Sequence, residues 1–100
     1  MRDFVDLKGA SGASYRFRRL PEGQSHLRIA GNYALLKRRS GGFSVVHVGV
    51  TDDLSQAREA CPPGMGATHL FTRLNVSRAF REAEHADLVA KYGAAGDEGE

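Results

Sequence analysis

The sequence has few of the features that would place it in several large classes of protein. Its single cysteine, Cys61, excludes an intrachain disulfide and suits a reducing compartment. No apolar run approaches the roughly 20 residues of a membrane-spanning helix, and the amino terminus has no signal-peptide pattern. The glycine-rich pieces lack the Lys-Ser/Thr ending of a phosphate-binding P-loop. We therefore expect a cytoplasmic domain without a disulfide framework, a membrane span or a nucleotide-binding loop.

The net charge of the sequence is small, but the charged residues are unevenly distributed. The 100 residues carry a net charge of +2, and a hydrophobic fraction of 41% is enough for one modest core. Residues 1–50 hold nine Lys/Arg against three Asp/Glu, whereas residues 51–100 hold five against nine. A basic amino-terminal half would attract a phosphate backbone, and salt would weaken the attraction. A solvated surface without such a partner fits the same charges.

Two apolar runs on either side of a basic hairpin form the centre of the pattern. The runs span residues 31–36 and 43–50, and Gly41-Gly42 between them supplies the backbone freedom that a tight reversal needs. Thr51 then has the properties of a helix N-cap, with Asp52-Asp53 in the first turn. The sequence predicts a hairpin that leads directly into a helix.

The remaining periodicity predicts an α+β fold. Aromatic residues alternate with arginines over residues 14–18, which is typical of a half-buried strand and here indicates an edge strand. Residues 67–74 alternate again and predict a third core strand. Helices are expected over about residues 52–61 and from an N-cap at Ser77 to Tyr92. The expected architecture is a small three-stranded sheet with an added amino-terminal strand, flanked by at least two helices.

The second helix divides into three faces. One arc contains His85, Leu88, Val89 and Tyr92, and we expect it to face the core. A second face of small residues is expected to permit close packing: Ala79, Ala83, Ala86 and Ala90. The third side holds Glu84, Asp87 and Lys91, which we expect to be solvated.

Gly31-Asn32-Tyr33 and His47-Val48-Gly49 resemble the two motifs of the GIY-YIG nuclease superfamily, and the continuation over residues 49–54 is also similar to it. Later segments look like those of bacterial members. The resemblance implies a GIY-YIG-like core at residues 31–93. Residues 1–30 would then be an amino-terminal extension, and the small acidic residues at 94–100 are expected to form a disordered tail.

The resemblance implies metal-dependent cleavage of a DNA phosphodiester. Tyr33 and His47 would transfer protons, although a tyrosine with an ordinary pKa of about 10 acts as a base only beside a cation or metal. Arg58 would stabilise charge on the phosphate. The hairpin residues Lys37, Arg38 and Arg39 would position the DNA backbone.

The metal site and the helix arginine depart from the family pattern. The resemblance implies that Mg²⁺ or Mn²⁺ is held at Glu84 or His85, with Glu82 as a further candidate. His85 stands where the family has glutamate, and imidazole suits Mn²⁺ or Zn²⁺ better than Mg²⁺. Ala57 stands where the arginine is expected, one residue before Arg58.

Three alternatives to an active nuclease stay open. Inward-facing His47, His69 and His85 could form a transition-metal site. A non-catalytic module could keep the scaffold and bind nucleic acid without cleaving it. The acidic carboxyl-terminal half could instead face a basic protein partner. We expect a divergent or degenerate nuclease with DNA as its partner, and a non-catalytic binding or interaction module is the alternative.

Overall fold

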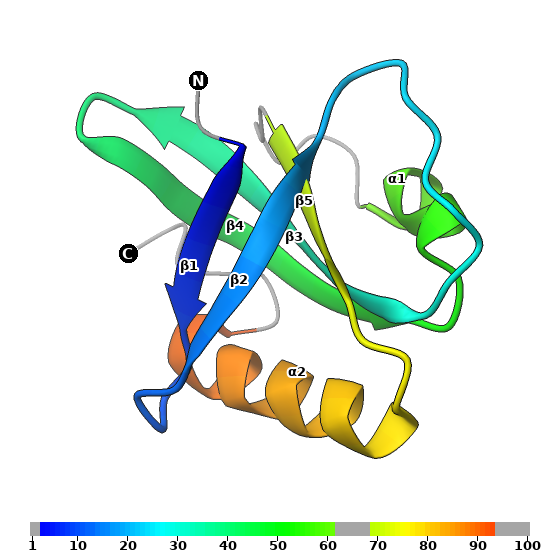
Figure 1. Ribbon diagram of the computed structural model, residues 1–100. Helices are drawn as coiled ribbons and strands as arrows, with labels where there is room; N and C mark the ends of the chain where they lie inside the picture. The colour runs from blue at the N-terminus through cyan, green and yellow to red at the C-terminus, as the bar shows by residue number, and fades with distance from the viewer. Residues whose placement is uncertain (1–2, 62–68, 94–100) are drawn as a thin grey trace.

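The computed structural model describes residues 3–61 and 69–93, and Figure 1 shows one antiparallel sheet that curls into a half-barrel. The sheet order is β1-β2-β5-β3-β4, and every neighbouring pair is antiparallel. The strands are β1 (Phe4–Lys8), β2 (Ser14–Leu20), β3 (Gly31–Arg39), β4 (Gly42–Thr51) and β5 (His69–Leu74). The short helical segments are the 3₁₀ turn η1 (Leu54–Gln56), α1 (Ala57–Ala60) and α2 (Arg78–Tyr92).

Two apolar clusters cover the two faces of the sheet. We name the faces after the helices that pack on them. On the α2 face, Leu88 packs with strand residues that include Phe17, Leu36 and Phe71. On the α1 face, Leu54 and Ala57 pack with strand residues that include Tyr33, Val46 and Leu70. Because side chains alternate along a strand, residues such as Tyr33 and Ala34 belong to different clusters.

The expected three-stranded sheet with flanking helices is wrong, because the structure is mostly an antiparallel sheet of five strands. The missed strand is β1, in which Val5 and Leu7 are buried and their neighbours are exposed. Five alternating residues give a weak local signal, and β1 is defined by its register with β2, from Phe4↔Arg18 to Lys8↔Ser14. β2 is an internal strand between β1 and β5, and β1 takes the edge.

The first helix is shorter than expected and begins differently. Thr51 ends β4, and Asp53 is the N-cap, because its carboxylate accepts a hydrogen bond from Ser55 N at 3.0 Å. Helical structure ends at Ala60, and Cys61 is extended with ψ 132°. The next residue is Pro62, and a residue before proline is disfavoured in the helical region.

α2 has the predicted bounds but presents other residues to the sheet. Ser77 caps its first turn and Gly93, with φ 79°, ends it, as expected. Leu88 is buried, and Val89 and Tyr92 pack against the same cluster. The expected packing face of alanines is wrong, because Ala79, Ala83, Ala86 and Ala90 are exposed. Glu84 and Asp87, expected in solvent, bond to groups on the sheet side.

Several sequence predictions lie outside the described residues. They are the loop at residues 62–66, the first two residues of the third core strand at 67–68, and the acidic tail at 94–100. Within the described ranges 3–61 and 69–93, no helix combines the length and the apolar character that a membrane crossing requires.

Candidate functional site

Tyr33 and His47 lie near each other on the α1 face. Tyr33 is paired with Gly49, and Leu35 is paired with His47, so the two rings are diagonal neighbours on β3 and β4. Their centroids are 6.2 Å apart and their planes are inclined by 42°. Tyr33 is only 6% exposed, and this burial raises its pKa above the ordinary value of 10.0, with a smaller contribution from Cys61. Its phenol is therefore protonated near neutral pH.

Arg58 makes a structural contact with the main chain. Its Nη2 donates to the carbonyl oxygens of Leu20 at 3.3 Å and Pro21 at 3.2 Å. The side chain thus connects α1 to the end of β2. These contacts occupy part of the guanidinium group that the family resemblance assigns to the phosphate.

Glu84 and His85 interact with different parts of the sheet. Glu84 Oε1 accepts hydrogen bonds from Arg73 Nε at 2.8 Å and from Asn75 Nδ2 at 2.9 Å. His85 is half-buried, and its buried Nδ1 has no hydrogen-bond partner among the residues that the structure describes. Burial lowers the pKa of His85, and repulsion from His47 lowers it further. Because Arg73 and Asn75 already bond to Glu84 Oε1, that carboxylate does not fit the expected metal site.

No cluster of three His, Cys, Asp or Glu side chains that could hold a metal ion occurs among residues 3–61 and 69–93.

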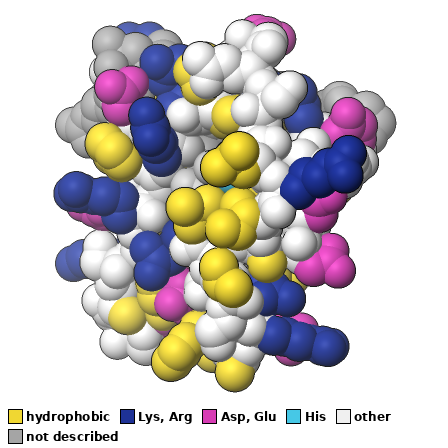
Figure 2. Space-filling view, turned by 45° about the vertical axis from the view of Figure 1, so that its right-hand side comes forward, with side chains coloured by type: hydrophobic (Ala, Val, Ile, Leu, Met, Phe, Trp, Pro, Cys, Tyr) yellow, Lys and Arg dark blue, Asp and Glu magenta, His cyan; other side chains and the backbone are white. Residues whose placement is uncertain are grey.

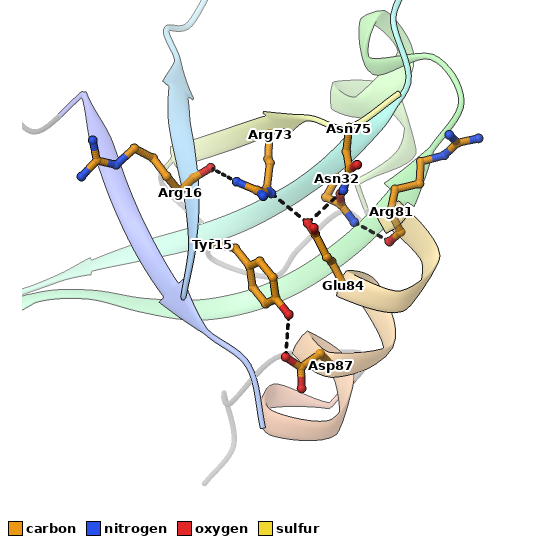
Figure 3. A network of polar contacts seen from close by, with 8 residues as sticks. All are labelled: Tyr15, Arg16, Asn32, Arg73, Asn75, Arg81, Glu84 and Asp87. Carbon is orange, nitrogen blue, oxygen red and sulfur yellow. Dashed lines mark hydrogen bonds and ion pairs between the residues drawn. The ribbon is translucent and has the colours of Figure 1, made fainter. Parts of the chain in front are cut away.

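A polar network fixes the first half of α2 to the sheet (Figure 3). Asn32 is buried, and its Nδ2 donates to the carbonyl oxygen of Arg81 at 3.0 Å. Its Oδ1 accepts from Asn75 Nδ2 at 3.0 Å, and the same amide reaches Glu84. The Arg73–Glu84 ion pair, at 2.8 Å and partly shielded from solvent, completes the network.

Asp87 fixes the second half of α2 to the start of the chain. Its carboxylate accepts hydrogen bonds from Ser11 N at 2.8 Å, Ser11 Oγ at 2.7 Å and Tyr15 Oη at 2.7 Å. These bonds lower the pKa of Asp87 and raise that of Tyr15. These contacts join residues more than 70 positions apart, so no local sequence pattern predicts them.

The basic hairpin lies at the end of β3 and β4. The pairing of these strands continues to Arg38↔Phe43 and Arg39↔Gly42. Arg38 and Arg39 are exposed and Lys37 is half-buried. Arg39 Nε donates to Ser44 Oγ at 3.0 Å. The three predicted nucleic-acid-binding residues thus lie at one end of the sheet.

An open groove of about 660 Å³ crosses the α1 face of the sheet near β1, β2 and β5. Its lining contains four arginines, one histidine and one carboxylate: Arg16, Arg18, Arg19, Arg73, His26 and Asp3. The carboxylate pairs with Arg19 at 3.3 Å. Arg73 is paired with Glu84 and Arg16 with Asp6, so ion pairs offset part of the positive charge of the lining. The sequence shows the arginines of β2 but not the groove, because segments far apart in the chain form it.

Phe4 supports two of the groove arginines. The guanidinium carbons of Arg16 and Arg18 lie 5.5 and 5.9 Å from the centroid of its ring. This is within the range of cation–π attraction. Arg16 also forms an ion pair with Asp6 at 3.0 Å, which lowers the pKa of that carboxyl. Arg18 has no ion pair within the part of the chain that the structure describes.

Comparison of the chain with models of known protein families, with curated proteins and with solved structures finds no match. Function is therefore inferred from the residues and their geometry. The class that they define is a small antiparallel β domain with a cationic groove on one face of its sheet.

Proposed function

We propose that this protein is a nucleic-acid-binding module that holds a phosphate backbone in the cationic groove. The observation that supports the proposal best is that Arg16 and Arg18 line the groove with exposed side chains, Arg16 in a solvent-exposed ion pair with Asp6. Guanidinium groups present planar sets of donors that match phosphate oxygens, and each contact releases counterions from the nucleic acid. A single sulfate-sized anion would engage only part of such a lining.

The stacking of Arg16 and Arg18 on Phe4 supports the same proposal. Two like charges stand over one ring, at 5.5 and 5.9 Å from its centroid. The ring restricts both side chains, so less conformational entropy is lost when a phosphate binds. Arg16 exchanges its exposed pair with Asp6 for the phosphate at little cost, because exposed ion pairs contribute little stability.

The basic hairpin provides a second set of backbone contacts. Lys37, Arg38 and Arg39 lie where β3 and β4 meet in their hairpin, from Lys37↔Ser44 to Arg39↔Gly42. Contacts of this kind position a nucleic acid and carry no sequence information by themselves. We expect the groove and the hairpin to contribute additively to the salt dependence of binding.

The test is the fluorescence anisotropy of labelled DNA oligonucleotides across a salt series from about 50 to 200 mM. Wild type is expected to bind with a negative slope of log affinity against log salt. Arg18→Gln should make that slope less negative by about 0.7 to 0.9, the value for one lost phosphate contact. Arg78→Gln is the matched control, because Arg78 is exposed on α2 and pairs with Glu82. Absence of binding at the lowest salt, or equal effects of both variants, would refute the proposal.

Phosphodiester cleavage is a second candidate function, and the closeness of Tyr33 and His47 favours it. The raised pKa of Tyr33 suits a phenol that donates a hydrogen bond to a phosphate oxygen better than one that acts as a base. Nicking of supercoiled plasmid with Mg²⁺ or Mn²⁺ tests this candidate, with Tyr33→Phe as the comparison. Nicking that disappears in the variant would support cleavage. No nicking, or nicking that the variant retains, would exclude it.

A further inference from the structure

Exposed apolar side chains accompany the arginines of the groove. Five large hydrophobic residues are exposed among those described: Phe4 at 46%, Leu27 at 76%, Leu74 at 58%, Val76 at 68% and Phe80 at 67%. Phe4, Leu27 and Leu74 line the groove. Val76 and Phe80 follow Leu74 closely in the chain. Figure 2 shows hydrophobic side chains gathered on one face, with basic side chains on both sides of them.

Packing and hydrogen bonds fix the backbone around Leu27, so the exposed position of the Leu27 side chain is part of the folded structure. Ile29 packs into the α1-face cluster, and its carbonyl oxygen accepts from Leu54 N at 2.8 Å. Ala30 O accepts from Asn75 N at 3.0 Å, which joins this segment to the end of β5. At the other end of the segment, Arg58 holds the carbonyl oxygen of Pro21.

The exposed residues Val76 and Phe80 also have a cation nearby. Arg81 Nη1 donates to the carbonyl oxygen of Val76 at 2.8 Å, which places a guanidinium group beside that residue. Phe80 lies in the first turn of α2, where its N–H is bonded to the cap Ser77. A cationic group therefore lies beside Val76, as Arg16 and Arg18 lie beside Phe4.

Such a surface fits single-stranded nucleic acid better than a nucleic-acid duplex. A duplex presents phosphates and groove edges and hides the faces of its bases, so it has nothing to place on exposed rings and aliphatic side chains. A single strand offers phosphates and free base faces together, and proteins bind it with cationic grooves that contain stacking rings. Among these five residues, Phe4 and Phe80 supply the rings.

We infer that the groove is selective for single-stranded nucleic acid, with phosphates on Arg16 and Arg18 and unpaired bases on Phe4, Leu74 and Phe80. The inference rests on the proposed function and names the substrate class of the same site. The surface places cations beside exposed apolar groups, and a single strand carries phosphates beside unpaired bases. The two are therefore chemically complementary.

The experiment compares a labelled oligothymidine of about 15 nucleotides with a duplex of equal length, using the full chain. Wild type should prefer the single strand at least tenfold. Leu74→Ser and Phe80→Ser should each weaken single-strand binding about five- to tenfold, as loss of a base contact does, and should leave duplex binding unchanged. Both side chains are exposed, so the fold should persist, which circular dichroism checks. Ala83→Ser, at an exposed position of α2, is the control.

Each contrary outcome has a distinct meaning. Equal affinity for single strand and duplex would overturn the selectivity and leave backbone binding intact. No binding to either probe would overturn the proposed function and the inference with it. Sedimentation velocity tests a competing occupant, a second copy of the chain. A dimer that Leu74→Ser and Phe80→Ser convert to monomer would overturn the inference.

Discussion

The ring of Tyr33 lies directly against the backbone of Gly49 on the neighbouring strand. The two residues are register partners on β3 and β4, and a Cβ added at Gly49 would overlap Cζ and Oη of Tyr33. Gly31 is similarly enclosed, because a Cβ there would overlap the carbonyl oxygen of Arg73 and approach Leu54. Gly31 and Gly49 therefore have a packing role that is independent of any catalysis.

Gly49→Ala should destabilise the protein by about 1 to 3 kcal/mol, the usual cost of forcing extra volume into a packed core. The added methyl group must displace a buried tyrosine ring. Urea denaturation monitored by tyrosine fluorescence measures the change. Gly41→Ala is the control, because a Cβ at Gly41 meets no atom within 4 Å and its φ is not positive. Equal stability of the two variants would contradict the packing role.

Local patterns predicted the elements whose signal lies within a single segment. β3, β4 and α2 appear near the expected positions, because their apolar periods and the caps Ser77 and Gly93 are local. β1 was missed because a five-residue strand depends on its partner. The first helix was predicted too long because Asp53, rather than Thr51, caps it.

The candidate site was predictable only in part for the same physical reason. The hairpin Lys37, Arg38 and Arg39 is contiguous in the sequence, so its position could be predicted. The groove is formed by β1, β2, the segment after β2 and the end of β5. The strand registers that bring these segments together depend on several segments at once, so no single segment predicts them. Likewise, Glu84 has a polar side chain, and only the fold reveals that Arg73 and Asn75 bind it.

Asn32→Ala should destabilise the fold by about 1 to 3 kcal/mol, because it leaves buried polar groups without partners. Asn32 donates to the carbonyl oxygen of Arg81 and accepts from Asn75. Chemical denaturation compares the variant with wild type, and Gln24→Ala at an exposed position is the control. A loss no greater than that of the control would show that water satisfies these groups equally well.

Asp87→Asn should lower thermal stability in a pH-dependent way. Hydrogen bonds from Ser11 and Tyr15 hold the pKa of Asp87 below its ordinary value of 3.8. Because the pKa is lower in the folded state than in the unfolded state, the stabilisation is present above pH 4 and is lost as the pH falls through the folded pKa. The difference in Tm between wild type and variant should therefore be largest near pH 7 and shrink below about pH 4.

Asp52→Asn, at an exposed position, provides the comparison for Asp87→Asn and should leave Tm unchanged across the same range. A Tm difference for Asp87→Asn that stays constant down to the lowest pH would mean that the loss comes from packing rather than from the carboxylate charge.

Phe4→Leu should separate stacking from charge in the groove. The substitution keeps an apolar side chain at the half-exposed position but removes the ring beneath Arg16 and Arg18. We expect the affinity for a single-stranded oligonucleotide to fall about five- to tenfold, the effect of losing one base–aromatic contact. The slope of log affinity against log salt should not change, because no phosphate contact is lost. Arg18→Gln should instead change that slope. If Phe4→Leu reduces the slope as much as Arg18→Gln does, the ring acts only by positioning the two guanidinium groups, and unpaired bases do not stack on it.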